Sequence, residues 1–405
     1  MAVVLACHNI EGATAGIMKR RFRIFILGAG FSKAAGLPLG DELWAEVLRR
    51  AMGRKGRSAK FERDLNNYIA YRRECDGIAL TPLEVKFEEF LAFLDVEHYL
   101  GLRGSDTWSA DGNEGQVIVK TLIGEILAER TPREDAIPAL YLRFASALLP
   151  SDYVLTFNYD VLLERALQAV RKPFRLFPAR YKAGSPTPNV LDLEREEVIV
   201  LKLHGSIDWF DRTQHRELEA EFERRGFSGG PRHPVFSHEG ELGVVPVVDS
   251  PGHETSPLSD MYRVQHLEAL YSKDILFHAA PWLLNPSAAK ILYSEKLREF
   301  WYGMGGAGAL NFGLAIIGYS LPPGDAYAKQ TLYQIVKNYQ TFSWNEEALG
   351  QRKTPLVIVD RCDTPEAQER FRRRFSFVDS SRATEILSGF DETVMSLFED
   401  MPGVL

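Results

Sequence analysis

The sequence predicts an α/β fold in which helices cover both faces of a doubly wound parallel sheet. Short apolar runs, such as residues 24–27 and 314–317, are long enough for buried strands but too short for helices. Longer stretches with helical periodicity separate them, and strands that are apolar on both sides are typical of parallel sheets. Each apolar run also ends in a cluster of small or polar residues.

The expected elements can be placed in order along the chain. A mostly helical stretch follows the first strand, and residues 211–260, rich in Gly, Pro, His and Ser, are expected to be irregular or dominated by loops. The strands are expected at residues 24–27, 153–157, 198–203, 314–317 and 356–359. The helices are expected at residues 41–52, 87–94, 116–128, 138–149, 161–170, 285–302, 326–338 and 364–400. Thr364 and Pro365 form a typical helix start.

Composition limits the class of protein. The chain has 405 residues and a formal net charge of -7, which gives no global attraction to nucleic acid or anionic lipid. Cys7, Cys75 and Cys362 are far apart, so they predict neither a disulfide framework nor a cysteine zinc site. We find no signal peptide and no bilayer-spanning stretch, and we expect a cytoplasmic protein.

The first strand leads into a tight glycine turn. Residues 28–30 read Gly-Ala-Gly and open a helix, a pattern in which backbone N–H groups can close on a phosphate. The third glycine of the full dinucleotide fingerprint is missing, because Lys33 stands in its place. A strand, turn and helix without any ligand remains the alternative.

Polar clusters follow all five expected strands. Because ligands bind beyond the carboxyl ends of strands in open parallel sheets, the clusters should converge on one site. The clusters are Gly28-Ala29-Gly30, Asn158-Tyr159-Asp160, His204-Gly205-Ser206, Gly318-Tyr319-Ser320 and Asp360.

These motifs resemble the sirtuin-like superfamily, and more closely its bacterial branch of NAD-degrading anti-phage defence proteins. The resemblance implies a Rossmann-like, sirtuin-like NAD-binding domain over residues 1–360. Within it, a large helical insertion is expected at about 41–150 and a loop-rich insertion at about 207–300. Residues 361–405 are expected to form a short helical C-terminal tail. The matching motifs are residues 28–32 with 35–38, residues 156–160, residues 203–206 and residues 318–322.

The resemblance also implies a role for each cluster. The glycine turn would approach the NAD pyrophosphate, with Ser32 donating its hydroxyl, and residues 318–320 would lie near the adenosine. Asp360 would accept hydrogen bonds from the adenine-side ribose, with a purely structural loop as the alternative, and Asp325 is a weaker candidate near the same turn. The expected NAD-binding residues are Gly28, Ala29, Gly30, Ser32, Asp160, Gly318, Ser320 and Asp360.

Asn158 and His204 are the expected catalytic residues. Asn158 would hold a ribose hydroxyl or the attacking water, and the alternative is that it caps the following helix. His204 would act as the general base, because imidazole titrates near neutral pH, and the alternative is a structural histidine at a strand end. Asp160 would orient the ribose or cap the helix.

Two departures from sirtuin deacylases narrow the activity. The three cysteines cannot form the four-cysteine zinc module of those enzymes, and Pro38-Leu39-Gly40-Asp41 replaces their Pro-Asp-Phe-Arg motif. Water is then the simplest acceptor, so we expect hydrolysis of NAD to ADP-ribose and nicotinamide, without a metal. The alternative is a non-enzymatic subunit that binds NAD or ADP-ribose and regulates a defence complex. We interpret His233, His238 and His253 as solvated loop residues.

An NAD hydrolase must be restrained in its host. We therefore expect a homo-oligomer and a partner chain, which the resemblance implies to be a HerA-type ATPase or a short Argonaute protein. The helical insertion and the tail are the expected assembly surfaces. Neither direct nucleic-acid binding nor membrane binding is expected.

Overall fold

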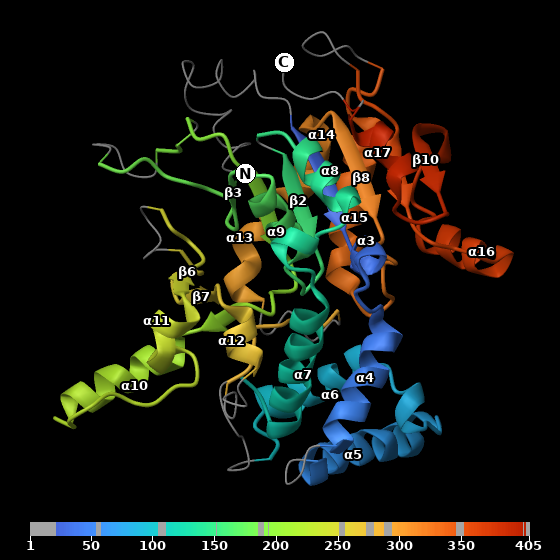
Figure 1. Cartoon of the computed structure of the whole chain (residues 1–405). Coiled ribbons are helices and arrows are strands. Elements are labelled where there is room, and N and C mark those ends of the chain that lie inside the picture. The colour runs from blue at the N-terminus through green and yellow to red at the C-terminus, as the bar shows by residue number, and fades with distance from the viewer. Residues whose placement is uncertain are drawn as a thin grey trace.

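The structure is a computed structural model of the whole chain (Figure 1). The residues it describes are 22–53, 58–103, 111–150, 152–184, 190–192, 194–250, 256–272, 279–286, 294–345, 352–399 and 401.

A seven-stranded sheet forms the centre of the molecule. Its strands run in the order β10-β9-β8-β1-β2-β4-β3, and every neighbouring pair is parallel. The strands are β1 (Arg23–Leu27), β2 (Tyr153–Thr156), β3 (Phe174–Arg175), β4 (Val198–Lys202), β8 (Gly313–Ile317), β9 (Leu356–Val359) and β10 (Ala383–Ile386). The predicted parallel α/β sheet is confirmed, and each of the five expected strands lies within one residue of its predicted bounds.

Both faces of the sheet are covered. Every residue of β1, β4 and β8 is buried, which requires packing on both sides of each strand. On one face, Phe25 of β1 makes edge-to-face contacts with Phe144 of α8 (Ala139–Ala147) and Phe398 of α17 (Glu392–Glu399). Aromatic side chains therefore anchor two sequence-distant helices on the central strand.

The direction in which the sheet grows reverses at β1. From β1 the chain adds β2 and β4 on one side, and later returns to add β8, β9 and β10 on the other. Where the strand order reverses, the connections that follow two adjacent strands leave in opposite directions. Open parallel sheets bind ligands in the crevice at this point.

Helices occupy most of the remaining described chain. Four of them, α4 to α7, form a helical lobe at the bottom of Figure 1, where Phe61 and Phe90 pack edge to face. The lobe helices are α4 (Gly40–Gly53), α5 (Ser58–Asp76), α6 (Phe87–Tyr99) and α7 (Glu114–Arg130). The others are α3 (Ala29–Ser32), α9 (Leu162–Ala169), α10 (Thr213–Arg224), α11 (Glu239–Leu242), α12 (Leu267–Ser272), α13 (Arg298–Trp301), α14 (Met304–Leu310), α15 (Ala326–Thr341) and α16 (Pro365–Arg374).

A second, three-stranded antiparallel sheet lies in the segment after β4. Its strands are β5 (Trp209–Asp211), β6 (Val244–Pro246) and β7 (Met261–Val264), in the order β5-β7-β6. Helix α10 projects beside it at the lower left of Figure 1. The expectation that residues 211–260 are irregular is therefore wrong for α10, α11 and β6, whereas loops make up most of the rest of the described part of this segment.

Two further expectations need correction. The tail after residue 361 is not wholly helical, because Ala383–Ile386 form β10 and extend the main sheet between α16 and α17. The helix expected at 285–302 does not begin at 285, since Asn285 and Pro286 are non-helical. Only two short turns, Glu295–Leu297 and Arg298–Trp301, are helical in its described part. Among the described helices, none is both long and apolar enough to cross a bilayer.

Candidate active site

The five predicted polar clusters begin at the carboxyl ends of the parallel strands in the main sheet. The strands end in register: Leu27 pairs with both Thr156 and Ile317, Thr156 pairs with Lys202, and Ile317 pairs with Val359. The clusters that follow these residues therefore leave the sheet side by side. The central clusters, after β1, β2 and β8, lie at the reversal of the sheet.

The glycine turn after β1 lies against the glycine turn after β8. The N–H of Gly30 donates to the carbonyl of Gly318 over 2.9 Å. A Cβ atom on Gly28 would lie 2.5 Å from Tyr319 Cα, and one on Gly30 would lie 2.7 Å from Gly318 Cα. Gly318 itself has a φ of +63°, and its Cβ would lie 2.2 Å from the nitrogen of Phe31. Contact between the two turns thus explains why glycine stands at each position.

Backbone donors at the first turn are engaged within the chain. The N–H groups of Gly28, Gly30 and Phe31 donate to the carbonyls of Ile317, Gly318 and Gly28. Ala29, the first residue of α3, is exposed at the surface. The role of this turn at a pyrophosphate stays a prediction, and in this arrangement those three N–H groups do not supply the hydrogen bonds.

Asn158 connects β2 to the glycine turn. Its Nδ2 donates to the Gly28 carbonyl over 3.0 Å and to Ser32 Oγ over 3.1 Å. Because a carbonyl oxygen can only accept, these contacts fix the orientation of the amide. Its Oδ1 receives no hydrogen bond from a described residue and is available to a ligand. Asn158 does not cap the following helix, which begins at Leu162 with Val161 as its N-cap.

Asp160 is turned inward at the start of α9. Its Oδ1 accepts a hydrogen bond from the N–H of Leu162 over 3.0 Å, which forms a turn directly before α9, although Val161 is the N-cap residue. Burial raises the pKa of Asp160, while the charge of Lys202 and a hydrogen bond from Ser32 oppose that rise. Lys202 donates to the Asp160 carbonyl and, over 2.8 Å, to Glu164 Oε1. This buried network supports the segment that carries Asn158.

His204 lies buried at the end of β4. Its Nε2 is 3.1 Å from Asp325 Oδ2, and its ring meets Phe157 edge to face with ring centroids 4.8 Å apart. The main-chain carbonyl of His204 accepts a hydrogen bond from the N–H of Leu284 over 2.9 Å. The strand end, the ring of Phe157 and the carboxyl of Asp325 therefore all restrain this imidazole.

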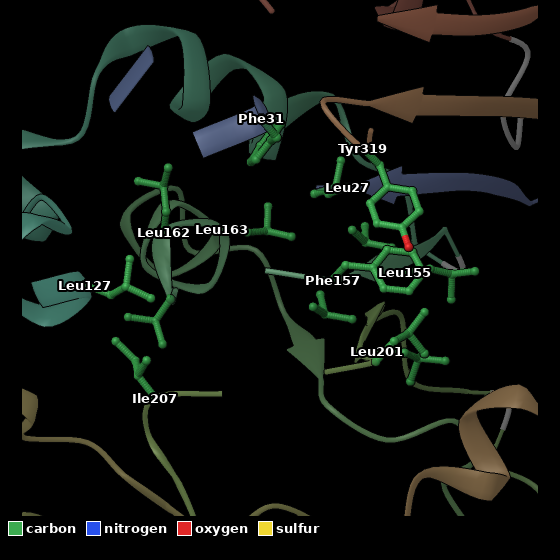
Figure 2. Packing of buried hydrophobic residues seen from close by; sticks show 14 of the residues in the cluster. Leu27, Phe31, Leu127, Leu155, Phe157, Leu162, Leu163, Leu201, Ile207 and Tyr319 are labelled. Carbon is green, nitrogen blue, oxygen red and sulfur yellow. The ribbon is translucent and has the colours of Figure 1, made fainter. Parts of the chain in front are cut away.

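Aromatic side chains join the His204 and Asn158 sides of the site. The ring of Tyr319 stacks on Phe157, with centroids 4.1 Å apart and an angle of 10° between the planes, as Figure 2 shows. The Tyr319 hydroxyl donates to Asp325 Oδ2 over 3.0 Å. Sequence reasoning assigned Tyr319 and Phe157 no role and gave Asp325 little weight. The available signal was an aspartate directly before a helix that follows a strand-end turn.

Two predicted residues lie apart from this group. Ser320 is exposed, and its carbonyl accepts a hydrogen bond from Arg374 of α16 over 3.0 Å. Asp360 is partly buried, which raises the pKa of its carboxyl, and its Oδ1 accepts from the N–H of Arg361. No hydrogen bond between described residues joins either side chain to Asn158 or His204. Their proposed contacts with adenosine stay predictions.

A segment after α12 ties the site to the helical lobe. We call residues 279–286 the bridge segment. Its Leu284 binds the main chain of His204, and its Ala280 N–H donates to Asp111 Oδ2 over 3.1 Å. The side chain of Asn285 donates to Asp95 of α6. The bridge segment therefore contacts both the strand end of His204 and two carboxyls near α6 and α7.

The histidines in the segment that contains the second sheet lie in a different environment from His204. His233 is not a solvated loop residue, because its Nδ1 accepts from the N–H groups of Val235 and Phe236. Burial lowers its pKa to about 4. His238 is exposed, as expected, and His253 lies outside the described residues. Across the described ranges, no three His, Cys, Asp or Glu side chains are grouped to hold a metal ion.

Comparisons with known proteins place one part of this site in context. The family model of the SIR2-like domain matches residues 152–220. No curated protein matches the chain significantly. Two solved structures with partial similarity are a sirtuin studied for substrate affinity (13% identity, TM-score 0.32, 98% of this chain and 100% of that one) and a Sir2 homologue in complex with 2'-O-acetyl ADP-ribose (13% identity, TM-score 0.33, 96% and 95%).

TM-scores of this size do not establish a shared fold, so the description of the fold rests on the strand order of the sheet itself. The family match is the informative comparison, because it covers β2, β4 and the clusters that follow them. The segment that contains Asn158, Asp160 and His204 is thus similar to a SIR2-like domain.

Proposed function

We propose that the protein is an NAD+ hydrolase that cleaves the nicotinamide–ribose bond to give ADP-ribose and nicotinamide. One observation carries the proposal: Asn158 and His204 follow adjacent parallel strands within the segment that matches a SIR2-like domain. Both side chains lie beside the reversal of the sheet, and both have tightly specified surroundings. A buried amide and a buried imidazole at such a position suit the chemistry of a polarised glycosidic bond.

The proposed reaction needs little from the protein, because the nicotinamide ring of NAD+ is already a cationic leaving group. Water attacks the anomeric carbon of the nicotinamide ribose, the carbon–nitrogen bond breaks, and its electron pair returns to the ring nitrogen. His204 takes the proton that water loses. Asn158 Oδ1, which is unoccupied by described donors, accepts a hydrogen bond from the water or from a ribose hydroxyl.

The rest of the dinucleotide would lie along the carboxyl ends of the same parallel strands. We propose that the pyrophosphate lies near α3 and the Ser32 hydroxyl, with the adenosine toward the turn after β8 and toward Asp360. Ser32 already binds Asn158 directly, so its hydroxyl is positioned relative to the proposed catalytic amide. Asp160 acts mainly by holding the start of α9.

NAD consumption by the purified chain tests this proposal. The wild-type protein should convert NAD+ into equal amounts of nicotinamide and ADP-ribose, measured by liquid chromatography. Asn158→Ala and His204→Ala should each lower turnover by roughly 10²-fold or more, because each removes a group that acts in the reaction itself. His238→Ala is the matched control, since His238 is exposed and lies in a 3-10 turn outside the main sheet.

Two outcomes would contradict the proposal. Turnover that survives both substitutions would show that the residue assignment is wrong. Binding of NAD or ADP-ribose without turnover, measured by calorimetry in the presence of the partner, would favour the alternative of a non-enzymatic regulatory subunit.

We further propose that the activity serves anti-phage defence and is restrained by assembly. The helical lobe and the tail are the proposed assembly surfaces for a homo-oligomer and for a partner such as a HerA-type ATPase or a short Argonaute protein. Exposed apolar side chains at the end of α6, Tyr99, Leu100 and Leu102, support the choice of the lobe. A monomer at all concentrations in size-exclusion chromatography would count against self-assembly.

A further inference from the structure

We infer that Asp325 is the residue that positions His204, by binding the imidazole Nε2 from the start of α15. The inference rests on the proposed function, because it gives the proposed general base a positioning residue. The segment that matches the SIR2-like domain ends at residue 220, so Asp325 lies outside it.

One carboxylate oxygen makes both contacts. Asp325 Oδ2 is 3.1 Å from His204 Nε2 and 3.0 Å from the Tyr319 hydroxyl. His204 is 3% exposed and Asp325 is fully buried. Because water competes little at this depth, a hydrogen bond to a carboxylate holds the ring more firmly than the same contact at the surface.

The other neighbours of His204 restrain its position but do not select its nitrogen. Phe157 meets the ring edge to face, Tyr319 stacks on Phe157, and Leu284 binds only the main chain. Among these contacts, only that with Asp325 distinguishes one ring nitrogen from the other. The contact with the carboxyl group therefore favours one orientation of the imidazole.

Asp325 supplies the negative charge at its contact with His204, because the neighbouring phenols are neutral. Burial raises the pKa values of Tyr159, Tyr319 and Tyr327, so these phenols keep their protons at neutral pH. From α6, Glu88 and Asp95 act on Tyr159. Asp325 is also the N-cap residue of a 16-residue helix, where the helix dipole favours a negative charge.

The pairing determines which nitrogen is basic. A carboxylate can only accept, so Nε2 carries the hydrogen and the lone pair of the neutral ring lies on Nδ1. The proton taken from water makes the ring cationic. The carboxylate then faces a cationic ring, which it stabilises without accepting the proton itself.

Three variants of the full chain test the inference. Asp325→Asn removes the charge with little change in shape, and Tyr319→Phe removes the hydroxyl but keeps the ring that stacks on Phe157. Asp208→Asn is the control, because it neutralises a buried aspartate in a different element, directly before β5. For each we would measure kcat and KM for NAD from pH 5 to pH 9. Histidine side-chain NMR, with His204→Gln to assign the resonance, gives a readout that needs no turnover.

We expect Asp325→Asn to lower kcat by about 10- to 100-fold, while KM changes by less than about threefold. Removing the negative charge lets the ring lose its proton at lower pH, so the acidic limb of the kcat/KM profile moves to lower pH. Tyr319→Phe should show a smaller loss in the same direction. Asp208→Asn should leave kcat and the pH profile within about twofold of wild type.

Wild-type kcat and an unshifted profile in Asp325→Asn would overturn the inference. If wild-type protein never consumes NAD, with or without its partner, the proposed function has failed and the NMR titration decides the inference alone. A His204 resonance that titrates at lower pH in Asp325→Asn supports the pairing, and one that titrates unchanged overturns it.

Discussion

Gly28, Gly30 and Gly318 allow close contact between the turns that follow β1 and β8. Each of the three would place a Cβ atom under 3 Å from backbone atoms of the facing turn. Backbone atoms cannot move aside as the end of a flexible side chain can. The glycines therefore set the distance between β1 and β8 at the point where their clusters begin, which in turn sets where Asn158 finds the Gly28 carbonyl.

Gly318→Ala should destabilise the protein by more than about 2 kcal/mol, because a positive φ and a backbone clash act together. The φ of +63° disfavours any residue with a Cβ, and the Cβ would lie 2.2 Å from the nitrogen of Phe31. Urea unfolding of the purified variant, followed by circular dichroism, measures the loss.

Gly306→Ala provides the matched control for that substitution. Gly306 lies in α14, and beyond the backbone of that helix nothing lies within 4 Å of the place where an alanine methyl group would sit. Alanine should therefore raise stability by roughly 0.5–1 kcal/mol. Equal stability of the two variants would contradict the close contact between the turns.

Sequence reasoning found the residues of the site more readily than their partners. Asn158 and His204 follow apolar runs, and the resemblance to the sirtuin-like superfamily singled them out within their clusters, while their catalytic roles stay predictions. The contact between His204 and Asp325 joins residues 121 positions apart, and no local pattern encodes it. The glycine turn suggested phosphate binding because the same residue pattern satisfies either a ligand or a neighbouring backbone.

The bridge segment is the element that makes the helical lobe part of the site. It holds the strand end of His204 through Leu284 and reaches the lobe through Ala280 and Asn285. Its lobe partners, Asp111 and Asp95, are carboxyls whose pKa values burial raises to about 6. Both groups change charge at mildly acidic pH, so the attachment of the bridge segment is pH-dependent.

The sign of that dependence follows from the direction of the pKa shift. A carboxyl with a folded-state pKa of about 6 binds its proton more tightly than the unfolded chain, whose value is 3.8. The resulting stabilisation is complete below 3.8 and is lost as the pH rises through about 6. Asp111→Asn removes the loss, so its stability relative to wild type should rise by roughly 1–1.5 kcal/mol between pH 5 and pH 7.5.

Thermal melting of both proteins at matched pH values measures this difference. Asp363→Asn is the control, because Asp363 is exposed and lies outside the contacts of the bridge segment. A difference between Asp111→Asn and wild type that stays constant from pH 5 to pH 7.5 would contradict the assignment.

Elements with a strong apolar pattern or a clear helix start, such as Thr364-Pro365 of α16, were predicted well, and two polar elements without either signal were not. The buried strands β1, β4 and β8 consist mostly of large apolar residues, which favour a buried position. Strand β10 at the sheet edge reads Ala-Thr-Glu-Ile and has two exposed residues, so it carries little apolar signal. Helix α10 has a single buried residue, His215, and shows no apolar stripe from which its periodicity could be recognised.

At the scale of the whole molecule, one buried ion pair joins elements at the amino ends of the strands. The candidate site lies at the opposite, carboxyl ends. Arg23 opens β1 and binds Asp152, which precedes β2, with Nη2 2.5 Å from Oδ2. The same guanidinium donates to the carbonyls of Ala147 at the end of α8 and Phe398 in α17. A single cation thus connects two strands with the two helices that cover them.

Asp152→Asn should lower the free energy of unfolding by about 3–5 kcal/mol, because it leaves the buried charge of Arg23 without its counter-charge. The midpoint of urea denaturation measures the change. Asn158 and His204 lie at the carboxyl ends of the strands, away from this ion pair. NAD turnover per folded molecule should therefore stay within about twofold of wild type.

A surface pair offers the comparison. Asp363 and Arg361 form an exposed ion pair, and breaking it should change stability by less than about 0.5 kcal/mol. Equal effects of the buried and exposed substitutions would show that the Arg23 pair does not hold the sheet and helices together.

The central position of β1 has a consequence for protein synthesis. Asn158 depends on the turn after the first strand, His204 follows β4, and Asp325 arrives only after β8 has been made. A ribosome must therefore translate about four-fifths of the 405 codons before the site can close. Fragments from interrupted translation that end before Asp325 lack the pairing with His204, which would keep the proposed activity from appearing on incomplete chains.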